Sequence, residues 1–165
     1  LERRADLMLI HANTLKALPY GERLMVTPIV DEPYRVICCS GHEVLSGNRQ
    51  LDDIIPHDWA IAGFDMFFQQ TLPQPLAALL STHDFPKYRL LSQTACLDLA
   101  RQSDVLTLVP ERSAVYLTQQ DGLSSFAFPG PLRFTICAAR VKNKATDTAE
   151  HGLLEEFIAA LRAAA

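Results

Sequence analysis

The residues best suited to bind a ligand follow two short apolar runs, each of which leads into a predicted helix. Residues 63–71 follow the run at 59–62, and residues 92–94 follow the run at 88–91. Where a strand leads into a helix, the first N–H groups of the helix carry a partial positive charge toward the end of the strand. Ligands of open α/β sheets bind beyond the carboxyl ends of the strands. The two segments therefore predict a site for an anion such as a carboxylate.

Side chains around these segments offer further contacts. The hydroxyls of Ser92 and Thr94 suit a carboxylate and equally suit a helix cap, so both roles stay open. His11, after the first apolar run, faces either the ligand from the opposite side or solvent. Four apolar side chains offer a wall for an aromatic group, with at least two of them expected in the core: Phe64, Met66, Phe67 and Phe68. The full set of predicted ligand-binding residues is His11, Gly63, Phe64, Asp65, Gln69, Ser92, Gln93, Thr94, Pro110 and Phe128.

Catalytic chemistry finds little support. No G-x-S-x-G motif is present, and His83 and His151 reach Ser92 only through the fold. The H-E-x-x-H, P-loop and G-x-G-x-x-G motifs are also absent. An acid–base pair for an enzyme would have to come from Asp65 and His11. We therefore expect a protein without catalytic residues, metal or cofactor.

The four cysteines indicate a reducing compartment. They stand at positions 38, 39, 96 and 137 without C-x-x-C spacing, so no zinc site is predicted. We expect buried, reduced thiols in a cytoplasmic protein. Cys96 lies near the start of a predicted helix, where the pKa of a thiol falls, so a redox sensor is the alternative.

Composition limits the partners. The 165 residues carry a net charge of −4, with 48% apolar and 21% charged residues, and no basic run. A segment that binds DNA by itself usually has a basic face, so direct DNA binding by these residues is not expected. No apolar stretch approaches the roughly 20 residues that cross a bilayer, and no signal segment opens the chain. We expect no membrane contact.

The predicted elements alternate between strands and helices in the middle of the chain. Apolar runs predict strands at 5–10, 24–29, 34–39, 59–62, 88–91, 105–109, 126–128 and 132–138, with Pro28 interrupting the second. Helices are predicted at 51–55, 71–80, from 92 or 94, at 111–120 and from 147, and a loop at 12–23. This alternation indicates a parallel sheet with helices on its faces.

Extended, proline-bearing segments flank this middle block and predict a hinge. Residues 33–40 and 128–131 would be crossovers between two lobes. The second lobe would be 41–127, and the first would combine 1–32 with 132–165.

Three sequence segments resemble one protein family over nearly the whole chain. Residues 3–9 resemble its G-E-L-D-L-A-L strand, 41–45 with 51–55 and Trp59 resemble its G-H-P-L-A … L-x-D-L signature, and 100–110 resemble its V-A-A-G-x-G-I-A-L-L-P signature. The chain thus resembles the effector-binding domain of LysR-type bacterial transcriptional regulators. It departs from the family at Ser103 and Val105, where two glycines are usual, and at Glu43, where proline is usual.

The resemblance implies a fold and a function. The fold is the α/β, periplasmic-binding-protein-like (type 2) domain, two-lobed, with parallel or mixed sheets and two hinge crossover strands. The first lobe would be incomplete, because members begin with a strand, a helix and a second strand that would lie upstream of Leu1. A small-molecule effector, expected to be a carboxylate, would bind between the lobes. It would modulate DNA binding by an upstream winged helix-turn-helix in a homodimer or homotetramer.

Two other functions stay open. A periplasmic-type solute-binding receptor has the same fold and would carry a secretion signal upstream in place of the helix-turn-helix. An enzyme on this fold, such as a dehydratase of small carboxylic acids, would need the Asp65 and His11 pair.

Overall fold

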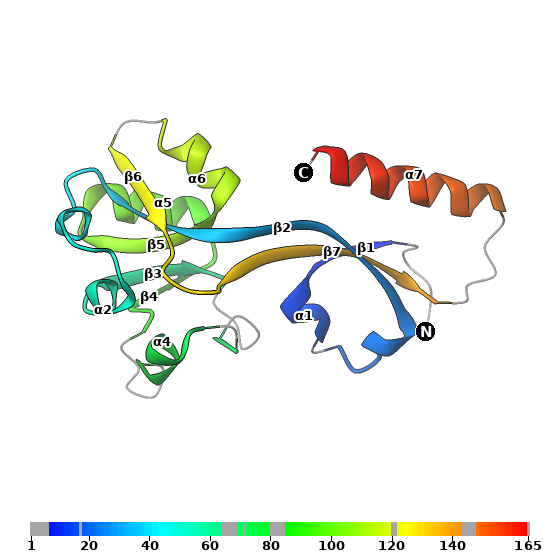
Figure 1. Cartoon of the computed structure of the whole chain (residues 1–165), viewed down its shortest axis with the longest axis horizontal. Helices are drawn as coiled ribbons and strands as arrows, with labels where there is room; N and C mark the ends of the chain where they lie inside the picture. The colour runs from blue at the N-terminus through cyan, green and yellow to red at the C-terminus, as the bar shows by residue number, and fades with distance from the viewer. Residues whose placement is uncertain are drawn as a thin grey trace. The chain divides into compact units, whose positions relative to one another are not determined.

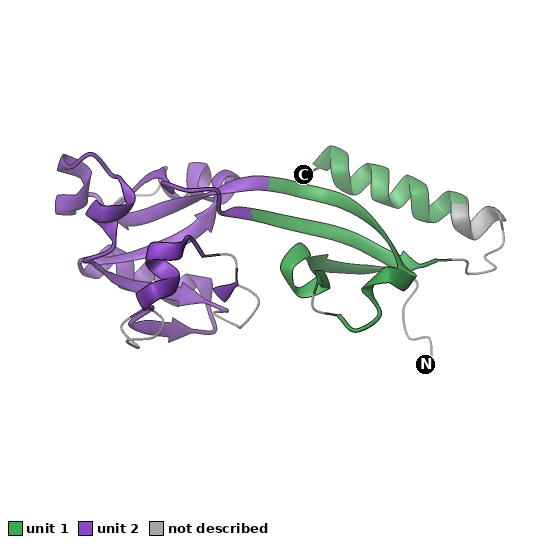
Figure 2. Cartoon of the chain, turned by 60° about the horizontal axis from the view of Figure 1, so that its bottom comes forward, with its two compact units in different colours: residues 1–31, 134–165 green, residues 32–133 purple. Residues whose placement is uncertain are grey.

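The computed structural model describes residues 7–16, 18–63, 69–70, 72–79, 85–119, 122–142 and 148–164. The chain forms two compact units, one from residues 1–31 and 134–165 and the other from residues 32–133 (Figure 2). It passes from the first unit into the second within strand β2 (Leu24–Cys39) and returns at the start of β7 (Arg133–Val141). The second unit is therefore one continuous segment, whereas the first is made from two.

The second unit contains a mixed sheet. Strand β3 (Asp58–Ala62) pairs in parallel with both β4 (Tyr88–Leu90) and β5 (Val105–Pro110), as the alternating sequence pattern predicts. The last part of β2 pairs antiparallel with β5 on one side and with β6 (Leu123–Ala127) on the other. Three parallel strands thus place their carboxyl ends at one edge of the sheet (Figure 1).

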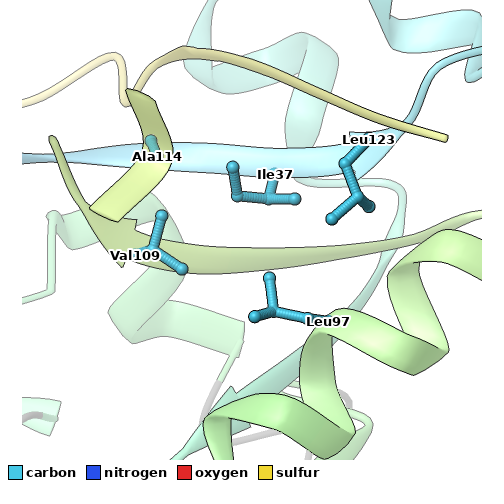
Figure 3. Packing of buried hydrophobic residues seen from close by; sticks show 5 residues of the cluster. All are labelled: Ile37, Leu97, Val109, Ala114 and Leu123. Carbon is cyan, nitrogen blue, oxygen red and sulfur yellow. The ribbon is translucent and has the colours of Figure 1, made fainter. Parts of the chain in front are cut away.

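Short helices connect and cover these strands. After β2 come the 3-10 turn η2 (Glu43–Ser46) and α2 (Leu51–Ile54), then α4 (Gln74–Leu79), α5 (Gln93–Gln102) and α6 (Glu111–Leu117). Buried apolar side chains from three strands and two helices pack together beneath α5 and α6 (Figure 3); they are Ile37, Leu97, Val109, Ala114 and Leu123. Burying a valine, leucine or isoleucine side chain contributes about 1.5–3 kcal/mol, so four of these five residues help to hold α5 on the sheet, and Ala114 adds a smaller contact from α6.

The first unit is built around an antiparallel pair. Strand β1 (Met8–His11) pairs with β7, with Met8 opposite Ala139 and His11 opposite Ile136. The helix α7 (Thr148–Ala164) follows β7 and buries Ile158. In the order of hydrogen-bonded strands β2 lies between β7 and β5, so the same strand serves the sheets of both units.

Two expectations about local structure were wrong. Residues 12–23 are not a plain loop, since they contain α1 (Ala12–Lys16) and the 3-10 turn η1 (Gly21–Arg23). The imidazole of His11 accepts a hydrogen bond from the backbone N–H of Asn13 at 3.3 Å and thereby satisfies one free donor of this single turn. Pro28 does not interrupt β2, which runs unbroken over 16 residues. Pro28 is exposed, and a strand tolerates a missing N–H where no ladder needs it.

Candidate functional site

The carboxyl ends of β3 and β4 lie side by side. The register places Ala62 opposite Leu90, the last residues of the two strands. Beyond them the backbone N–H of Gly63 donates to the carbonyl of Leu90 at 3.0 Å, which ties the two strand ends together. Gly63 has a φ of 61° and open space where a Cβ would stand, so its backbone angle alone requires glycine. Gly63 is therefore the turn residue that follows the paired ends of β3 and β4.

Helix α5 begins at the same edge. Ser92 is its N-cap, with its hydroxyl oxygen accepting a hydrogen bond from the N–H of Ala95 at 3.4 Å. Ser92, rather than Thr94, is thus the cap that the sequence left undecided. A capping serine still has its own O–H to donate, and the exposed Thr94 stands two residues later.

A buried amide adds a further donor at this edge. The side-chain nitrogen of Gln93, in the first turn of α5, is buried and has no hydrogen-bond partner in the described part of the chain. An amide N–H₂ of this kind costs free energy until it finds an acceptor. Together with the free N–H groups of the helix start, it suits an anionic oxygen.

The other predicted residues are placed as follows. Pro110 ends β5, which runs parallel to β3, and precedes α6, so it lies at the same edge of the sheet. Phe128 follows β6 and is buried, with its N–H bonded to the carbonyl of Tyr34 at 3.1 Å. Gln69 is half-buried, and its carbonyl accepts from the N–H of Leu72.

His11 belongs to the first unit, where its ring lies 5.4 Å from that of Phe134. Phe64 and Asp65 lie outside the described residues, as do Met66, Phe67 and Phe68. The structure thus brings together Gly63, Ser92, Gln93 and Thr94, with Pro110 on a neighbouring strand of the same edge.

A second site contains only one of the residues that the sequence predicted to bind a ligand, Phe128. It is a pocket of about 450 Å³ in the second unit, lined by Arg35 of β2, residues 48–50, and residues 125–129 of β6 and the turn that follows it. We call it the Arg35 pocket. Besides Phe128, its visible signal in the sequence is an arginine inside the apolar run at 34–39.

Burial suppresses the reactivity of three of the four thiols. Cys38, Cys96 and Cys137 are buried, whereas Cys39 is half-buried. Burial raises the pKa of Cys38 to about 12 and also raises the pKa of Cys96, even though Cys96 lies in the first turn of α5. Thiolate is the reactive form, so these side chains are poor targets for oxidants.

We expect a thiol reagent such as Ellman's reagent at pH 8 to modify one cysteine quickly in the native protein and the other three only after unfolding. The fast reaction should belong to Cys39 and disappear in Cys39→Ser. Rapid modification of Cys96 in that variant would contradict this expectation and would revive the redox-sensor alternative.

Across the described residues no helix has both the length and the hydropathy to span a bilayer.

Solved structures of transcriptional regulators resemble this chain in fold, whereas no curated protein sequence matches it. A probable transcriptional regulator from Pseudomonas aeruginosa is 19% identical, with a TM-score of 0.65 over 97% of this chain and 50% of that one. The chain spans about half the length of the first regulators it matches.

Two further solved structures are effector-binding domains. The BenM domain with its effector benzoate is 17% identical, with a TM-score of 0.64 over 97% of this chain and 70% of that one. The QuiR domain in complex with shikimate is 14% identical, with a TM-score of 0.64 over 93% and 69%. These likenesses agree with the periplasmic-binding-protein-like type 2 fold that the sequence predicts. The model of the LysR substrate binding domain matches residues 1–165, so the chain belongs to this family, which is one of regulator effector-binding domains and not a known family of enzymes.

Proposed function

We propose that this chain senses a small carboxylate effector for a LysR-type bacterial transcription regulator. The observation that carries the proposal is the edge where β3 and β4 end side by side, with Gly63 bonded to the last residue of β4 and the capped start of α5 following that strand. Three kinds of donor belong to the start of α5: helix N–H groups, the Ser92 and Thr94 hydroxyls, and the Gln93 amide.

A carboxylate fits these donors better than a neutral ligand does. Hydrogen bonds to a charged acceptor are roughly twice as strong as neutral ones, and the helix start adds a favourable field. Benzoate and shikimate, the ligands of two structures with this fold, are both carboxylates. The predicted apolar wall at 64–68 would contact the body of an aromatic or cyclic effector.

The rest of the proposal concerns the whole regulator. The net charge of −4 leaves DNA contact to a separate helix-turn-helix domain. Effector binding would favour one conformation of this domain, and a homodimer or homotetramer in the cytoplasm would transmit that change to the DNA-binding domains. The alternative of a solute-binding receptor has no observation in its favour, and the domain would carry out no catalysis.

A thermal-shift screen tests the proposal. Benzoate and shikimate are compared with the neutral analogues benzyl alcohol and glucose, all at matched ionic strength. A carboxylate present at 100 times its Kd adds about 2.7 kcal/mol to the free energy of unfolding. For a chain of this size that raises Tm by about 5–10 °C. Stabilisation by the neutral compounds without any by carboxylates would refute the proposed class of effector.

A further inference from the structure

We propose that the Arg35 pocket binds a second small molecule, one that carries several anionic oxygens, such as a phosphorylated or polycarboxylic compound. Its lining residues all belong to the second unit, and none of them is shared with the edge formed by Gly63 and the start of α5. The lining contains two arginines and no carboxylate.

Arg35 is held in place with donors to spare. Its Nε–H donates to the hydroxyl oxygen of Ser125 at 3.2 Å, and Nη2 donates to the Ser125 carbonyl at 3.4 Å. Nη1 reaches a carboxylate oxygen of Glu111 at 3.5 Å, the longest of these contacts. A guanidinium has five N–H donors, so two are left for a ligand. Because Glu111 is well exposed, water weakens its attraction for Arg35.

Arg49 has an uncommon backbone conformation for an arginine. It has a φ of 58°, the left-handed region that non-glycine residues rarely adopt. Its side chain is exposed and makes no ion pair or hydrogen bond with any described residue. Glycine would suit this backbone better, so an arginine here points to a role outside folding.

The neighbours of Arg49 complete a polar lining. Asn48 and Gln50 flank it, and Gln50 is held by its backbone N–H, which donates to Asp53 at 2.9 Å, and by its amide, which donates to the Asn48 carbonyl at 3.3 Å. Hydrogen bonds therefore hold the chain directly before and directly after Arg49.

Volume and charge together define the ligand class. About 450 Å³ lies within the range of small-molecule pockets and is many times the ~30 Å³ of one water molecule. Guanidinium groups recognise phosphate and carboxylate with paired N–H donors. Two such groups, with Asn48 and Gln50 in the same lining, suit a ligand of two or more negative charges.

The test is isothermal titration of the 165-residue chain with inorganic phosphate and with citrate at constant ionic strength. We expect saturable binding of at least one, and the tighter of the two assigns the ligand to phosphorylated or polycarboxylic compounds. Arg49→Gln should weaken binding at least tenfold, and Arg49→Gly should do the same without lowering Tm. The matched control is Arg162→Gln, an exposed arginine in the last turn of α7 in the other unit, which should bind as the unmodified chain does.

Three results would overturn the inference. The first is that neither anion binds saturably. The second is that Arg49→Gln and Arg162→Gln weaken binding equally, which would mean a general effect of charge. The third is that Ser92→Asp abolishes the binding of phosphate and citrate, which would place both anions at the start of α5. None of these results bears on whether benzoate or shikimate stabilises the domain, so the two proposals fail separately.

Discussion

Replacing Trp59 with alanine is expected to lower the free energy of unfolding by about 3–5 kcal/mol. Trp59, on β3, is 1% exposed, and its ring packs edge-on against Phe85 with centroids 5.7 Å apart. Its indole N–H donates to the carbonyl of Ile54 at the end of α2 at 3.1 Å. Truncation leaves a cavity and removes this hydrogen bond. The side chain through which β3 contacts both α2 and Phe85 is then lost.

Urea unfolding followed by far-ultraviolet circular dichroism measures this loss, because Trp59 is the single tryptophan and its fluorescence disappears with it. Trp59→Phe keeps most of the ring and removes the donor, so it should cost less than the alanine variant. Tyr116→Ala, at an exposed aromatic on α6, is the control and should stay within about 0.5 kcal/mol. A Trp59→Ala variant within 1 kcal/mol of the unmodified chain would mean that this contact does not organise the second unit.

Replacing Ser92 with aspartate is expected to weaken the binding of benzoate or shikimate more than tenfold while leaving stability unchanged or slightly higher. Aspartate caps a helix as well as serine does and its charge favours the helix start. The same charge repels a carboxylate. Two like charges about 4 Å apart at an effective dielectric of 20 repel by about 4 kcal/mol, and tenfold in Kd needs about 1.4 kcal/mol.

Asparagine separates the two roles of this residue. Ser92→Asn keeps the cap and adds no charge, so carboxylate binding should change less than about threefold. Isothermal titration with whichever of benzoate and shikimate raises Tm gives the Kd of each variant. The repulsion by aspartate should weaken at high salt. Equal binding by the aspartate and asparagine variants would place the effector away from the start of α5.

The sequence predicted those parts of the fold that depend on residues close to one another along the chain. Apolar runs separated by helical patterns are enough to place β3, β4 and β5 in parallel, and the serine before α5 is a local capping signal. The five-residue α1 was missed because Pro19 and Gly21 indicate a turn, while its stabilising contact comes from the side chain of His11. The full length of β2 was missed because a proline in the sequence predicts the end of a strand. The sequence does not show that Pro28 is exposed within the strand.

The candidate sites divide in the same way. Gly63 and residues 92–94 directly follow the strands β3 and β4, so position in the sequence was sufficient to predict them as site residues. The Arg35 pocket joins residues 35, 49 and 125, and residues 35 and 125 come together because β6 pairs with β2. No short-range pattern contains that pairing. The φ of Arg49 is likewise a property of the folded loop and has no counterpart in its residue type.

The way the second unit is inserted into the first has a consequence for synthesis on the ribosome. Met8 of β1 pairs with Ala139 of β7, so β1 emerges long before its partner, whereas every strand of the 32–133 segment has emerged before β7 does. Domains generally fold as units in the order in which they are made. The nascent chain would therefore hold a folded second unit while the exposed apolar β1 waits for its partner, and this interval is when the growing polypeptide is most open to chaperones and to aggregation.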